Sequence, residues 1–242
     1  MATTKRLMLL ATLVLPGCSS SSPSASPTVD SGTDAIVTID SGTVDTGAAD
    51  TGAIDTGIAA EAGAEAGPAY PAGPYGVAVG SVLDPSVTWQ GYVPNATMPS
   101  TIKMSDLYDP DGSKGINAIV FDNAGQWCVA CQYVAAYIPG WLSSTGGNWT
   151  ALGVAFVTLV IQTNNYEPAT IATAKQWRDM FQLADTYVAA DPLITFATAS
   201  LPHTLLVDPR TMKVTVNLDN DANYGGQAAD PTVTQLAMTN KK

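Results

Sequence analysis

The sequence predicts an α/β domain with a central mixed sheet and flanking helices, preceded by a long linker that does not fold. From residue 70 onward, apolar runs that suit β-strands alternate with segments of helical spacing. All five Trp and all nine Tyr residues of the 242-residue chain fall in this same part. Its length is ordinary for one domain with a single core.

Four short segments rich in apolar or β-branched residues are predicted to be strands: 116–121, 154–162, 204–208 and 212–218. Two segments with helical spacing lie between them, at 129–138 and 169–184. Pro139 is expected to end the first helix, and Pro168 precedes the second. Because strands and helices alternate, a mixed sheet is favoured over an all-β or all-α core.

The segment before this domain has the composition of a spacer. Residues 19–68 contain no basic and no aromatic side chain, and Ser, Pro, Thr, Gly, Ala and Asp dominate. A five-residue pattern, mostly Asp-Thr-Gly with two further residues, recurs between Asp40 and Gly57. Such a stretch cannot bury a core, so residues 18–69 are predicted to be a disordered acidic linker and 70–242 the folded domain.

The first 17 residues are predicted to be a signal peptide. Lys5 and Arg6 precede a mostly apolar run at 7–15, which is about half of the ~20 residues that a membrane-spanning helix needs. Residues 15–18, Leu-Pro-Gly-Cys, are similar to the bacterial lipobox. That resemblance implies that Cys18 is lipidated and becomes the N-terminus; a plain secretory signal is the alternative.

The same resemblance implies a protein of the cell envelope that is anchored by lipid. Ser19 stands where an aspartate commonly retains Gram-negative lipoproteins at the inner membrane, so the outer membrane, facing the periplasm or the surface, is expected. The net charge of -11 argues against nucleic acid as a partner. Apart from Cys18 the chain has two cysteines, which excludes a scaffold of several disulfides.

Those two cysteines belong to the motif Trp127-Cys128-Val129-Ala130-Cys131, which lies between a predicted strand and a predicted helix. A sulfur atom at a helix N-terminus faces unpaired backbone N–H groups and the positive end of the helix dipole. We therefore expect the pKa of Cys128 to lie below that of a free thiol, so that the nucleophilic thiolate forms near neutral pH. Cys131, one turn later, is placed to close a disulfide with it.

At these residues the chain resembles the thioredoxin superfamily, in particular its exported, membrane-tethered redoxins, over about residues 75–220. The resemblance implies a thioredoxin-like fold and a thiol-disulfide oxidoreductase that acts on envelope proteins, with a redox partner and no organic cofactor. Cys128 would attack and Cys131 would resolve. Asp122, six residues before Cys128, matches the buried acid that takes the proton from the second cysteine.

Downstream, Leu201 and Pro202 precede a predicted strand and are similar to the cis-proline segment of that family. The resemblance implies that these two residues shape the substrate groove and that Trp127 covers one side of it. Ala130 stands where the family usually has proline, a position that influences the reduction potential. The resemblance therefore leaves open whether the domain reduces or oxidises its substrates.

Three other interpretations of the same residues remain. Cys128, Cys131 and His203 could hold copper, as in thioredoxin-fold assembly factors, although those usually space their cysteines by three residues. A solvent-facing loop histidine is the simpler reading of His203. Zinc would lack ligands in a chain with one histidine, and the pair could also be inert in a non-catalytic thioredoxin fold.

Single residues argue against a peroxidase site and against a calcium loop. Peroxide-reducing redoxins carry Thr or Ser three residues before the reactive cysteine, and this chain has Gly125 there, so peroxidase activity is not expected. The segment 219–230, from Asp219 to Asp230, partly imitates a calcium loop but has Tyr224 where such loops have glycine. A polar surface loop explains the same residues.

Overall fold

The computed structural model describes residues 68–196, 199–219 and 230–242. The predicted signal peptide, Cys18 and nearly all of the predicted linker lie outside these ranges, as does the interior of the 219–230 loop. What the sequence predicts for them therefore remains a prediction. Among the helices that are described, none combines the length and the apolar character needed to cross a bilayer.

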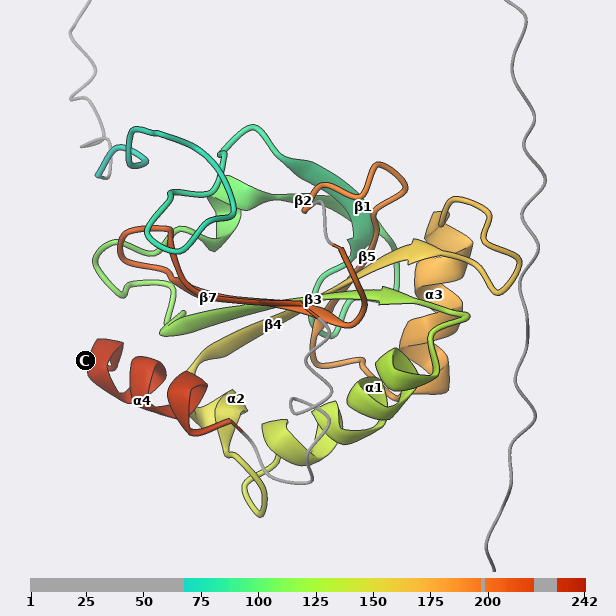
Figure 1. The fold of residues 1–242 in the computed structure, drawn as a ribbon. Helices are drawn as coiled ribbons and strands as arrows, with labels where there is room; N and C mark the ends of the chain where they lie inside the picture. Colours follow the sequence, from blue (N-terminus) through green and yellow to red (C-terminus); the bar gives the residue numbers. More distant parts are fainter. Residues whose placement is uncertain (1–67, 197–198, 220–229) are drawn as a thin grey trace, which may run out of the picture. The chain divides into compact units, whose positions relative to one another are not determined.

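Seven strands of the described chain form one mixed sheet in the order β2-β1-β5-β4-β3-β6-β7 (Figure 1). Neighbours are parallel from β3 through β4 to β5 and antiparallel elsewhere. This architecture confirms the predicted α/β fold with a central mixed sheet and flanking helices. The strands are β1 Thr88–Tyr92, β2 Ser100–Lys103, β3 Ala118–Gly125, β4 Val154–Gln162, β5 Tyr187–Ala190, β6 His203–Asp208 and β7 Lys213–Asp219.

The described α-helices all pack on one face of the sheet, which we call the helix face (Figure 1). The opposite face is covered by residues from Tyr70 to Leu107, including the short 3-10 helix η1, Met104–Leu107. Side chains of β3 alternate between them, with Val120 and Ala124 on the helix face. The helices are α1 Val129–Leu142, α2 Trp149–Leu152, α3 Ile171–Met180 and α4 Pro231–Asn240.

The central strand β3 differs from its prediction in a way that matters for the site. It begins two residues later than expected and continues to Gly125, whereas the apolar run in the sequence stops at Phe121. Because β4 and β6 pair with it on both sides, the ladder carries polar Asp122 and Asn123 into the buried interior. By contrast, β4 has the predicted bounds, and β6 and β7 lie within one residue of theirs.

Both predicted helices form, and α1 begins at the predicted residue, but the C-terminal boundary of α1 and both boundaries of α3 differ from the prediction. Pro139 does not end α1, which continues to Leu142. Proline costs this last turn one hydrogen bond, while buried Trp141 holds it in place by packing against Trp149 and Phe156. A capping box at Thr170 begins α3 later than predicted.

The C-terminal end of α3 also comes earlier than the sequence predicts. Gln182 adopts the left-handed conformation at φ 57°, and the N–H of Leu183 bonds back to the carbonyl of Arg178 at 2.9 Å. These are the features of a Schellman motif, which normally uses glycine at the left-handed position. Because glutamine stands there in place of glycine, the sequence does not indicate where this helix ends.

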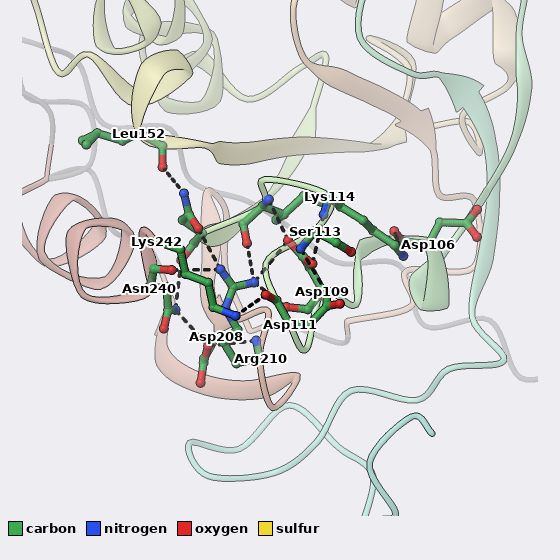
Figure 2. A network of polar contacts seen from close by, with 12 residues as sticks. Asp106, Asp109, Asp111, Ser113, Lys114, Leu152, Asp208, Arg210, Asn240 and Lys242 are labelled. Atoms are coloured by element: carbon green, nitrogen blue, oxygen red, sulfur yellow. Dashed lines mark hydrogen bonds and ion pairs between the residues drawn. The ribbon is translucent and has the colours of Figure 1, made fainter. Parts of the chain in front are cut away.

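A polar network lies at the end of the sheet where β3 begins and β6 ends (Figure 2). Arg210, which follows β6, donates to the backbone carbonyls of Asp109, Ile116 and Asn240 and pairs with the Asp109 carboxylate at 3.1 Å. The fully buried Asp109 carboxylate also accepts the N–H groups of Lys114 and Ile116. Because a buried charge is tolerated only when it is paired and hydrogen-bonded, this network joins the start of β3, the end of β6 and α4 into one frame.

Candidate functional site

The two cysteines of the motif form a disulfide at the start of α1. Cys128 and Cys131 are joined with their Cα atoms 5.2 Å apart. Cys128 is the N-cap of the helix, and its sulfur accepts the backbone N–H of Cys131 at 3.1 Å. Cys131 is fully buried, whereas Cys128 keeps 6% of its surface exposed. The first sulfur thus faces the helix N-terminus, as the sequence predicts.

The sequence around the two cysteines, from Asn123 to Tyr166, contains no charged side chain. That stretch supplies the end of β3, all of α1 and α2, and β4. Val129 and Tyr133, on the first turns of α1, are more than 60% exposed. This stretch contributes no lysine or arginine that could stabilise a thiolate on Cys128. What it does contribute is the backbone N–H groups and the dipole of α1.

Trp127 is held in place by groups from the far end of β4. Its indole N–H donates to the side chain of Gln162 at 3.0 Å, and its ring packs on Tyr166 with centroids 5.0 Å apart. The backbone N–H of Gln126 also bonds to the carbonyl of Gln162 at 3.0 Å. Tyr166 itself is 63% exposed and adopts a left-handed backbone at φ 62°, an uncommon conformation for an aromatic residue.

The segment with Leu201 and Pro202 lies beside this loop, as the resemblance implied. The peptide bond between the two residues is cis, and Pro202 is buried. Contacts of Gly125 show how close the segments are: a Cβ atom there would lie 2.9 Å from Trp127 Nε1 and 3.4 Å from Leu201 Cδ1. Only a residue without a side chain lets the end of β3, Trp127 and Leu201 meet.

Asp122 lies in the interior on the same face of the sheet as the disulfide. It is 1% exposed, stands between Val120 and Ala124 on the helix face, and no described residue hydrogen-bonds to either of its carboxyl oxygens. Burial raises the pKa of Asp122 from 3.8 to about 7. A carboxyl with such a pKa can both accept and release a proton near neutral pH, which is what a general base requires.

His203 does not lie where the sequence interpretation put it. It is the first residue of β6 and 2% exposed, so the expectation of a solvent-facing loop histidine is wrong. It pairs in register with Asn123, and its ring lies on the face opposite the cysteines because residues of β6 alternate like those of β3.

Both ring nitrogens of His203 have partners. The side-chain nitrogen of Asn123 lies 2.9 Å from Nδ1, and the side-chain oxygen of Asn217 lies 2.9 Å from Nε2. An amide nitrogen only donates and an amide oxygen only accepts, so Nδ1 accepts and Nε2–H donates. No cluster of three His, Cys, Asp or Glu side chains suited to a metal ion occurs in the part of the chain that the structure describes. The copper interpretation, which needs His203 beside Cys128 and Cys131, is therefore not supported.

Sequence reasoning did not identify three residues near the motif. Gln162 and Tyr166 fix Trp127, and Thr158 lies beside Asp122 on the next strand. For Thr158 a signal existed, since it is the only polar residue inside the apolar run of β4 before its last position. For Tyr166, which belongs to a turn, no pattern in the sequence indicates the contact.

Comparison with known proteins gives relatives only at the level of structure. No protein-family model matches the sequence, and no curated protein matches it either. Among solved structures, a Chlorobium tepidum protein assigned as the thiol:disulfide interchange protein DsbE shares 17% identity, with a TM-score of 0.44 over 66% of this chain and 96% of the other.

Two further solved structures show the same range of likeness. A thiol:disulfide interchange protein from Bacteroides sp. shares 17% identity, with a TM-score of 0.41 over 61% of this chain and 86% of the other. The peroxidoxin BcpB from Mycobacterium tuberculosis shares 10% identity, with a TM-score of 0.44 over 68% and 98%. At such identities these likenesses concern the arrangement of the chain and not its activity.

The buried Asp122 carboxyl predicts how the stability of the oxidised protein depends on pH. Its pKa is 3.8 ordinarily and about 7 when folded, so between these values the folded chain holds a proton that the unfolded chain has lost. Stability therefore falls as pH rises through this window and is level above it. In Asp122→Asn the free energy of unfolding should not fall in this way. Urea unfolding at each pH should show the variant becoming more stable relative to wild type, by on the order of 4 kcal/mol between about pH 4 and pH 8.

Asp185→Asn, at an exposed aspartate, controls for the loss of a carboxylate as such. Parallel stability profiles for wild type and Asp122→Asn would show that Asp122 does not hold a proton in the folded chain.

Proposed function

We propose that the domain exchanges disulfides with protein substrates through Cys128 and Cys131. The observation that carries this proposal is the placement of the disulfide: its first sulfur caps α1, and its second cysteine is the more deeply buried of the two, at 0% against 6% exposure. A disulfide that only staples a fold has no need for a helix N-terminus or for a buried carboxyl on the same side of the sheet. Asp122 supplies that carboxyl.

In the reducing direction the Cys128 thiolate attacks the substrate disulfide, forms a mixed disulfide and expels one substrate thiolate. The Cys131 thiol gives its proton to the Asp122 carboxylate, and the resulting thiolate attacks the Cys128 sulfur. This closes the Cys128–Cys131 disulfide and expels the second substrate thiolate, which is then protonated. Electrons and protons balance without an organic cofactor, and the reverse sequence oxidises a substrate dithiol.

The surface around Cys128 suits an extended protein segment. Leu201, which precedes Pro202, and Trp127 both lie close to Gly125, and Tyr166 packs on the Trp127 ring. Backbone groups beside a cis proline can pair with an extended chain, and apolar walls favour a segment with apolar side chains. Cys128 and Cys131 would thus act on proteins rather than on small thiols, and a separate redox partner would return the two cysteines to their starting oxidation state.

Peroxide reduction is disfavoured by the space at Gly125. A threonine or serine there would place its Cβ 2.9 Å from Trp127 Nε1, closer than real contacts allow, so the hydroxyl used by peroxide-reducing redoxins cannot be introduced without moving Trp127. The likeness to a peroxidoxin extends to the fold and leaves this difference untouched.

Exchange by the two cysteines predicts distinct outcomes for their serine variants. Cys131→Ser should accumulate a mixed disulfide with a model protein substrate, because Cys128 still attacks and nothing resolves it. Cys128→Ser should give neither a trapped complex nor turnover. Mass spectrometry of non-reduced samples detects the complex, and alkylation against pH should show Cys128 reacting below the pH at which a free thiol does.

Ser86→Ala, at an exposed turn that precedes β1, serves as a control and should retain exchange. No trapped complex, together with ordinary thiol reactivity of Cys128, would favour the non-catalytic interpretation instead.

We also propose that the protein is exported and anchored by a lipid on Cys18, so that its substrates are envelope proteins. The support is the sequence alone: a basic start, a short apolar run and the residues Leu-Pro-Gly-Cys at 15–18. Cells fed a labelled fatty acid should incorporate label into the wild-type protein in the membrane fraction, and Cys18→Ala should lose it. Equal labelling of both, or both being recovered soluble, would rule the anchor out.

A further inference from the structure

Asp122 has two in-register neighbours, and both are threonines. It pairs with Thr158 on the parallel strand β4 and with Thr204 on the antiparallel strand β6. Thr158 lies between Phe156 and Val160, which face the helices, so its side chain shares that face with Asp122. All three polar residues are 1% exposed or less. They form a polar row across an apolar sheet face.

Two members of this row have polar atoms without a partner. No described residue hydrogen-bonds to Oδ1 or Oδ2 of Asp122 or to Oγ1 of Thr158. Along β3 the neighbours of Asp122 on this face are apolar Val120 and Ala124, and beyond Thr158 the row continues with Val188 on β5. Buried polar groups almost always have a hydrogen-bond partner, and adjacent strands lie only about 4.8 Å apart. Each of the two groups is therefore the natural partner of the other.

We infer that Thr158 is a positioning residue for Asp122: its hydroxyl donates a hydrogen bond to the Asp122 carboxylate once that group has lost its proton. A side-chain rotation about the Cα–Cβ bond of Thr158, or a single bound water, closes the distance. The neutral hydroxyl would not compensate the charge as a cation would. It would supply one charge-assisted hydrogen bond in a place where nothing else on that strand can.

The consequence is a control on when Asp122 accepts a proton. Burial alone disfavours the carboxylate, and a donor that bonds only to the charged form opposes this effect. With Thr158 present, the carboxylate is available to Cys131 at lower pH than burial alone would allow. This inference rests on the proposed function for its catalytic meaning, but not for the contact itself.

The test is a titration of Asp122 in the oxidised protein, followed by the carboxyl carbon NMR signal that disappears in Asp122→Asn. Thr158→Val keeps the shape of the side chain and removes the hydroxyl, so the midpoint should rise by on the order of one pH unit, a tenfold weaker acid. Thr158→Ser removes a methyl group and keeps the hydroxyl, so it should titrate like wild type. Far-UV circular dichroism confirms that each variant is folded.

An unchanged midpoint in Thr158→Val, or equal shifts in the valine and serine variants, would overturn the inference. So would a shift in Thr204→Val without one in Thr158→Val, because the contact would then belong to β6. The readout needs neither substrate nor exchange, so it separates this inference from the proposed function. If exchange occurs, its pH midpoint in Thr158→Val should move upward with that of Asp122.

Discussion

The structure depends on placing an ionisable carboxyl inside the central strand of its sheet. Asp122 cannot move to the surface, because β4 and β6 pair with β3 on either side and α1 covers the face toward which its side chain points. Desolvation then raises its pKa to about 7. A side chain that lowers the stability of the fold as pH rises toward 7 is poorly explained by packing, whereas the proposed proton transfer from Cys131 would require a carboxyl that is buried and titratable.

Around this carboxyl the chain brings together segments that are far apart in sequence. The end of β3 supplies Gly125, the last residue of β4 supplies Gln162, and the loop before β6 supplies Leu201. All of them contact Trp127 or its immediate neighbours. On the opposite face the Asn123–His203–Asn217 chain of hydrogen bonds fixes the start of β6, which directly follows the cis peptide. The start of β6 is thus fixed on the face opposite the disulfide.

The sequence predicts the elements that carry an uninterrupted pattern, and tertiary pairing decides the rest. Nine apolar-rich residues make β4 readable to its last position, whereas β3 could be followed only to Phe121, since the burial of Asp122 is imposed by its neighbours. The four-residue strand β5 is too short for a periodic signal. His203 was expected in the loop before β6, but the strand begins one residue earlier, and strand alternation then fixes its ring on the face opposite the cysteines.

Asp122 is proposed to take the proton of Cys131 during exchange, and a single-turnover experiment decides whether it does. Reduced protein is mixed with a disulfide-bonded model substrate, and release of the second substrate thiol is followed as a function of pH. We expect a midpoint near pH 7 in wild type, set by the Asp122 carboxyl, and slow release at neutral pH in Asp122→Asn that recovers at high pH. Superimposable profiles for the two proteins would contradict it.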